Sequence, residues 1–163
     1  MDLARAARHL FTTEWGVRRA FPRATLDAIE RAIAHGEQTH GGQIRFAVED
    51  ALELHELVRG MSARDRAVEV FSRLRVWDTQ HNNGVLIYLL FAERNAEIVA
   101  DRGISALVGQ EEWEAVCRAM EQRFARHEFE AGVLGGIEAV GDLLRKHFPS
   151  RGAGELPDKA VVL

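Results

Sequence analysis

The pattern of apolar and polar positions predicts three strands. Val85 to Phe91 is a run of seven apolar residues, rich in strand formers and too short to span a bilayer. A second strand-like run covers 96–101, after a short reversal at 93–95. A third run, Gln43 to Glu49, alternates apolar and polar side chains, as expected of a half-buried strand. The first and second of these runs therefore form an antiparallel hairpin.

Apolar residues recur at helical spacing in five other segments, which predicts amphipathic helices over 2–11, 22–40, 62–75, 110–127 and 130–147. The helix over 62–75 joins the strands at 43–49 and 85–91. A right-handed crossover of this kind makes its two strands parallel. The expected fold class is therefore α/β, with a small mixed sheet (strands near 43–49, 85–91 and 96–101) between layers of helices.

Three parts are expected along the chain. Residues 1–20 read as an N-terminal amphipathic helix and linker, 21–149 as the α/β domain, and 150–163 as a mobile C-terminal tail without periodicity. The apolar residues of the first helix are predicted to pack against the domain. A membrane-surface or partner-binding helix is the alternative there, because Trp15, Arg18 and Arg19 follow it.

Composition narrows the functional classes. The chain has 163 residues and a net charge of −4, and it lacks the basic tract that would favour nucleic acid as a partner. Cys117 is the single cysteine, which excludes an internal disulfide and a thiolate zinc cage. The beginning of the chain resembles neither a secretory signal nor a membrane anchor, and no transmembrane segment is predicted. Cytoplasm is therefore the expected compartment.

Polar residues gather in two loops at one end of the predicted hairpin, and both loops should lie at the same edge of the sheet. Three interpretations remain open from the residues alone: a phosphate-handling or hydrolytic site, a site for a hard cation such as Ca²⁺ or Mg²⁺, and ordinary turn chemistry. The residues concerned are Asp78, His81, Asn82, Asn83, Asp101, Arg102 and Gly103.

The same stretch resembles a known family. The features that carry the likeness are Asn83 to Ile87 at the start of the central strand, Ile98 to Ile104 at the glycine turn, and Phe129 with Gly132 in the last helix. With these, the chain resembles the TPM-domain family, which includes a thylakoid-lumen phosphatase, and in particular a short soluble bacterial subgroup. Its segments RAFP, IRFAVE, SRLRVWDT, NNGVLIY, ADRGI and HFP are similar to that subgroup, over about residues 3–149.

The resemblance implies an α/β sandwich. It also implies two activities: acid phosphatase activity, described for plant relatives, and binding of divalent cations through acidic residues beside the central strands. This sequence departs from the wider pattern, because the segment 105–109 after the glycine turn contains no acidic residue.

The leading hypothesis is therefore a TPM-domain protein whose polar edge binds a divalent cation, Ca²⁺ or Mg²⁺, or a phosphate group. Weak phosphomonoester hydrolysis would use Asp78 or Asp101 as metal ligand or nucleophile, with Asn82, Asn83, Arg102 and Gly103 binding the ligand. Whether the chain is an enzyme is left open. The alternative is a non-catalytic module that docks a protein partner through the N-terminal segment.

Overall fold

The computed structural model describes residues 2–149 and 155–163, and it has a four-stranded mixed sheet in the order β3-β2-β1-β4. The strands are β1 (Gln43–Glu49), β2 (Gly84–Leu90), β3 (Asn95–Ala100) and β4 (Val161–Val162). The helices are α1 (Leu3–Phe11), α2 (Glu14–Ala20), α3 (Arg23–Glu37), α4 (Leu54–Val58), α5 (Ala63–Arg73), α6 (Arg102–Ser105), α7 (Gln110–Ala125) and α8 (Phe129–His147), with a short 3-10 helix, η1 (Phe91–Glu93).

The predicted fold class is confirmed. β1 and β2 are parallel, with Gln43 opposite Gly84, and the intervening α5 makes the expected crossover. β2 and β3 are antiparallel, with Val85 opposite Ala100, so the hairpin is also present. The reversal between them runs through η1 and Arg94, whose backbone is left-handed with a φ of 51°.

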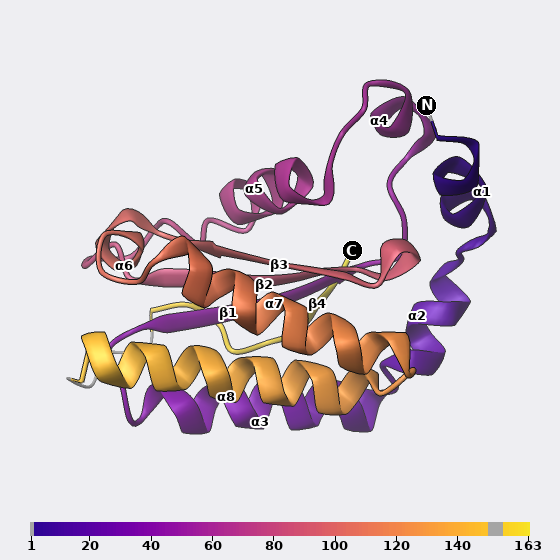
Figure 1. The fold of residues 1–163 in the computed structure, drawn as a ribbon. Coiled ribbons are helices and arrows are strands. Elements are labelled where there is room, and N and C mark those ends of the chain that lie inside the picture. Colours follow the sequence, from indigo (N-terminus) through magenta and orange to yellow (C-terminus); the bar gives the residue numbers. More distant parts are fainter. Residues whose placement is uncertain (1, 150–154) are drawn as a thin grey trace.

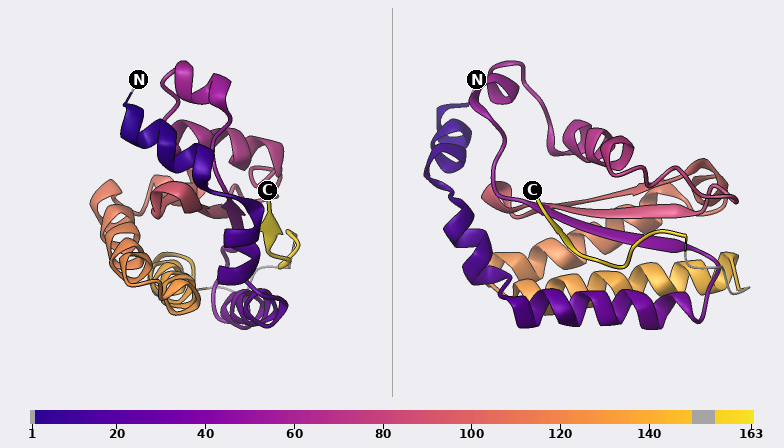
Figure 2. Two further views of the ribbon diagram at one scale, coloured as in Figure 1. Left: turned by 90° about the vertical axis from the view of Figure 1, so that its right-hand side faces the viewer. Right: turned by 180° about the vertical axis from the view of Figure 1, so that it is seen from behind.

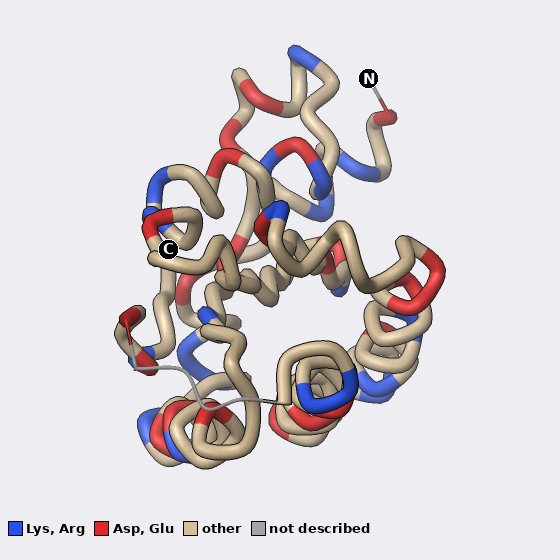
Figure 3. Tube along the Cα trace, turned by 90° about the vertical axis from the view of Figure 1, so that its left-hand side faces the viewer, with Lys and Arg blue, Asp and Glu red and all other residues tan. Residues whose placement is uncertain are grey.

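Helices cover both faces of the sheet (Figures 1 and 2). α3, α7 and α8 lie on one face, over the odd-numbered side chains of β2 such as Ile87. α5 lies on the other face, over even-numbered side chains such as Leu86. All seven residues of β2 are buried, because helices cover both faces and strands flank both edges. Acidic and basic residues are interspersed along the helices rather than gathered on one side (Figure 3).

Glycines allow α7 and α8 to pack closely. A Cβ at Gly132 would lie 2.6 Å from a ring carbon of Phe124, and one at Gly136 would collide with Met120. Both glycines face α7, whereas Gly135 faces open space. Gly132 and Gly136 thus mark the positions at which α7 and α8 approach closely.

The N-terminal segment differs from the prediction. The residues of α1 that are buried are Ala6 and His9, whereas Leu3, Leu10 and Phe11 are exposed. The residues expected to link this helix to the domain contain a second helix, α2, of which only Val17 is buried. The apolar face of α1 was therefore assigned to the wrong side, because polar contacts rather than apolar packing fix the helix.

Smaller differences occur elsewhere. α6 was not predicted. The mobility of the C-terminal tail stays a prediction: residues 150–154 lie outside the described residues, and 155–163 run beside β1 and end in β4. β4 pairs in parallel with β1 through Val161 and Val162, an element that the sequence pattern does not predict.

Candidate functional site

The two polar loops meet at one edge of the sheet, as predicted. The backbone N–H of Gly103 donates to the carbonyl of Asn82 over 3.0 Å, and that of Asp101 donates to Gly84 over 2.8 Å. A Cβ at Gly103 would lie only 2.5 Å from the Asn82 carbonyl oxygen. Asn82 itself has a left-handed backbone, with a φ of 51°. Glycine and asparagine at these positions are therefore explained by the close packing of two turns.

Asp78 is part of an exposed turn. Its carboxylate pairs with the Arg75 guanidinium at 2.6 Å, and both side chains are more than half exposed. Its backbone N–H donates to the Arg75 carbonyl over 3.0 Å. Arg75 also lies over the ring of Trp77. The local contacts of Asp78 are thus those of a surface ion pair, and they connect it to none of the other predicted site residues.

The side chains of Asn83 and Asp101 make different local contacts. The buried Asn83 side chain donates from Nδ2 to the Gly41 carbonyl. Asp101 Oδ1 accepts the backbone N–H of Arg102 at 2.7 Å and caps the four-residue helix α6. Because Asp101 lies opposite Gly84 and side chains alternate along a strand, Asn83 and Asp101 project to opposite faces of the sheet.

The predicted residues thus share an edge without forming one set of ligands. Asn83 Oδ1 and Asp101 Oδ2 are buried and have no hydrogen-bond partner among the described residues. Within residues 2–149 and 155–163, no group of three or more His, Cys, Asp or Glu side chains is placed to hold a metal ion. Arg102 is exposed and contributes only its backbone to the turn.

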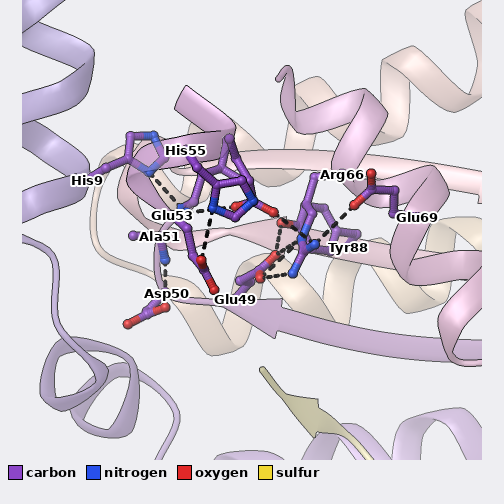
Figure 4. A network of polar contacts seen from close by, with 11 residues as sticks. His9, Glu49, Asp50, Ala51, Glu53, His55, Arg66, Glu69 and Tyr88 are labelled. Atoms are coloured by element: carbon purple, nitrogen blue, oxygen red, sulfur yellow. Dashed lines mark hydrogen bonds and ion pairs between the residues drawn. The ribbon is translucent and has the colours of Figure 1, made fainter. Parts of the chain in front are cut away.

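A buried ionic network lies toward the carboxyl ends of β1 and β2, away from the predicted edge (Figure 4). Glu49 of β1 accepts two charge-assisted hydrogen bonds from Arg66 of α5, at 2.9 and 2.6 Å, and a third from the Tyr88 hydroxyl at 2.6 Å. Arg66 also pairs with Glu56 and Glu69, each at 3.1 Å. This network joins two strands and two helices.

The network perturbs the titration of its members. The hydrogen bonds that Arg66 donates to Glu49 raise the pKa of Arg66, and burial raises the pKa of Tyr88, with the charge of Glu49 acting in the same direction. Both side chains therefore keep their protons over the whole physiological range. Arg66 and Tyr88 donate hydrogen bonds to both carboxylate oxygens of Glu49. The network therefore stabilises the fold and does not present a reactive group.

A second polar cluster anchors α1. His9 is buried, accepts the Leu52 backbone N–H at Nδ1 over 2.9 Å, and lies 2.8 Å from Glu93 through Nε2. Arg5 donates to the same Glu93 oxygen over 2.6 Å and to the Met61 carbonyl over 2.8 Å. Burial acts to raise the pKa of Glu93, but the hydrogen bonds from His9 and Arg5 outweigh it and lower this pKa.

The anchoring of α1 leaves its apolar face in solvent. The exposed fractions are 77% for Leu3, 65% for Leu10 and 85% for Phe11, and Trp15 of the neighbouring α2 is 66% exposed. We call these four side chains the N-terminal face. α1 and α2 lie together beyond one end of the sheet (Figure 1). None of the described helices is both long enough and apolar enough to cross a membrane.

Sequence reasoning missed the polar anchors because their partners are distant in the chain. Leu52 and Glu93 lie 43 and 84 residues from His9. The only local signal was a histidine and an arginine on the polar side of an amphipathic helix. The exposed apolar face could be recognised only once those contacts were known.

Comparison with known proteins defines the class. The TPM-domain family model matches residues 18–143, so the chain belongs to the TPM-domain family. It is similar to the BA42 protein from the psychrophilic bacterium Bizionia argentinensis, with 31% identity, 86% of this chain and 93% of that chain covered, and a TM-score of 0.74. A weaker likeness joins it to the N-terminal domain of the cg2496 protein from Corynebacterium glutamicum (15% identity, 86% and 76% covered, TM-score 0.48). No curated protein matches.

Proposed function

We propose that this TPM-domain protein is a non-catalytic interaction module that docks a partner protein through the N-terminal face. One observation carries the proposal: four large apolar side chains, each at least 65% exposed, lie on two adjacent helices. Large apolar side chains exposed together on neighbouring helices often mark an interaction site, and Trp and Phe are frequent energetic centres of interfaces. The polar anchors of α1 hold this face outward.

Charge indicates what kind of partner fits. Residues 2–20 contain four arginines and two acidic residues, a local net charge of +2 on a chain with a net charge of −4. Arg8, Arg18 and Arg19 are exposed on the same two helices, and Arg18 pairs with Glu14 at 3.0 Å. A segment with apolar residues flanked by acidic ones is complementary to this surface in polarity and charge.

Site-specific crosslinking tests the proposal. Phe11 is replaced by the photoreactive analogue p-benzoylphenylalanine, with Leu107, 53% exposed at the other end of the sheet, as the matched position. We expect a specific adduct only from position 11. The partner identified in it should bind the Phe11→Ser, Trp15→Ser double variant at least tenfold more weakly than the wild type, because two central aromatic anchors are lost.

The control is Leu107→Ser, which should bind that partner with unchanged affinity. Unchanged binding by the double variant would contradict the proposal. Adducts formed only with a second copy of the same chain would also contradict it, since they would replace a partner protein by self-association.

The second proposal is binding of Ca²⁺, Mg²⁺ or a phosphate group at the polar edge, with weak phosphomonoester hydrolysis by Asp78 or Asp101. Its support is the family resemblance together with the buried, unpartnered Asp101 Oδ2. The test compares turnover of a generic phosphomonoester with either cation or with chelator, in the wild type and an Asp78→Asn, Asp101→Asn variant. Equal rates in the two proteins would remove the catalytic part.

Cation binding has a separate measurement. A cation that binds the folded chain must raise its melting temperature, so millimolar Ca²⁺ or Mg²⁺ should shift the wild type and not the double Asn variant. No shift in either protein would rule against a cation site at this edge.

A further inference from the structure

An open groove of about 740 Å³ lies next to the N-terminal face. Its walls come from the end of α1, from η1 and from the turn between α7 and α8, three segments that are far apart in the chain. Phe11 belongs both to the groove and to the N-terminal face. The groove is therefore continuous with the surface on which the partner is proposed to dock.

The groove carries excess positive charge. Arg8 and Arg94 line it, and neither has a carboxylate partner within 4.0 Å among the residues that the structure describes. Glu93 also lines the groove, but Arg5 and His9 already bind its carboxylate. The Glu93 carboxylate is thus already bound by two side chains that do not line the groove. The guanidinium groups of Arg8 and Arg94 remain available to an anion.

Turn geometry brings two of the lining side chains together. Arg94 closes the hairpin and His127 closes the turn before α8, both with left-handed backbones, at φ values of 51° and 62°. Their side chains meet, with Arg94 Nη2 3.3 Å from His127 Nε2. A guanidinium uses one N–H for this contact and keeps the rest, in a planar fork that suits a carboxylate.

Three phenylalanines form much of the remaining wall, beside Thr12 and Ala92. The rings of Phe91 and Phe129 lie 4.9 Å apart, and both line the groove, as does Phe11. Aromatic walls beside unpaired guanidinium groups favour a ligand that carries an apolar side chain and an anionic group close together.

We infer that this groove receives an acidic segment of the docked partner protein. A carboxylate side chain of that segment lies between Arg8 and Arg94, and a neighbouring aromatic or leucine side chain packs on the phenylalanine rings. This inference rests on the proposed function, since it specifies the partner of the same surface. It adds a requirement for negative charge that the apolar face alone does not impose.

Selection from a randomised peptide library displayed on phage tests this inference with the intact chain as bait. We expect the wild type to enrich peptides that place Asp or Glu beside an aromatic residue or leucine. The enriched peptides, made synthetically, should bind Arg94→Gln at least tenfold more weakly than the wild type. Arg73→Gln, which removes an exposed arginine of α5 that lies outside both the groove and the predicted polar edge, should bind them with unchanged affinity.

The outcomes separate the two claims. Peptides that lose affinity for Trp15→Ser but bind Arg94→Gln normally, or that carry no acidic residue, would overturn the inference and leave the proposed function standing. Peptides that bind both variants with full affinity would overturn both. Failure to enrich any peptide above a surface without protein would also overturn the inference.

Discussion

The two ends of the sheet both collect charged side chains, yet they do so in different ways. At the polar edge, Asp78 pairs with Arg75 three residues away, and Asp101 caps the residue that follows it. At the carboxyl ends of β1 and β2, Glu49 contacts Arg66 and Tyr88, which lie 17 and 39 residues further along the chain.

This difference separates turn chemistry from tertiary interaction. Local contacts between exposed groups add little stability, whereas a buried charge must be paired or it destabilises the fold. Asp, Asn, Arg and Gly close together in a sequence are therefore weak evidence for a site, because turns use the same residues. Charged residues that stand apart in the sequence, on the inner sides of their elements, carry more structural information.

The largest expected effect comes from breaking the buried network. Arg66→Met leaves Glu49 and Glu56, each with a side chain only 8% exposed, without their cation. Loss of one partner from such a cluster costs about 3–5 kcal/mol of unfolding free energy. Urea denaturation measures it. A loss of unfolding free energy below about 1 kcal/mol would show that the buried network contributes no more to stability than an exposed ion pair.

A glycine substitution probes the packing of the two turns at the polar edge. Gly103→Ala places a Cβ 2.5 Å from the Asn82 carbonyl and 2.8 Å from that of His81, and we expect a loss of about 1–3 kcal/mol. Gly135→Ala, in the interior of α8 with open space around it, is the matched control and should gain about 0.5–1 kcal/mol. Equal effects in denaturant melts would contradict the close contact.

The polar end also contains a titrating acid that the predicted site does not include. Burial raises the pKa of Glu37 to about 7 from 4.5, and the nearby Asp158 acts in the same direction. Between these pH values the folded chain keeps a proton that the unfolded chain has lost, so rising pH lowers stability until about pH 7 and no further.

Glu37→Gln tests this dependence while preserving an acceptor for the Ile44 backbone N–H, which Glu37 binds at 2.8 Å. The urea midpoint of the wild type should fall more steeply between pH 5 and pH 7.5 than that of the variant. Parallel slopes for the two proteins would place the titration elsewhere.

The smallest effect is expected for the exposed pair at the polar edge. Arg75→Met removes the partner of Asp78, but both side chains are more than half exposed, so the change should lie within about 1 kcal/mol. Urea denaturation of Arg75→Met and Arg66→Met compares the same substitution at the two ends of the sheet. A loss as large as that of Arg66→Met would mean that Asp78 has a structural role beyond its turn.

The sheet could be predicted because its signals are local. Val85 to Phe91 is continuously apolar, and Gln43 to Glu49 alternates, so strand, crossover and hairpin follow from neighbouring residues. β4 could not be predicted, because two valines carry no period and their pairing depends on β1, more than 100 residues earlier.

The candidate site was harder to predict than the fold, because its contacts join residues that are distant in the chain. The meeting of the loops at 78–83 and 101–103 follows from the hairpin, and it is confirmed. The orientation of each side chain depends on register and caps, which composition does not specify. The groove draws on α1, η1 and the α7–α8 turn, so the pairing of Arg94 with His127 has no counterpart in any local pattern.

The position of β4 has a consequence for how the chain folds during synthesis. A strand with a bare edge can pair with another chain, and β1 is covered on its outer side by a segment close to the C-terminus. Because a ribosome makes β4 after the other described strands and helices, a nascent chain holds β1 with one edge open until β4 has been made. Intermolecular strand pairing is then a hazard for the growing polypeptide before β4 pairs, rather than for the folded chain.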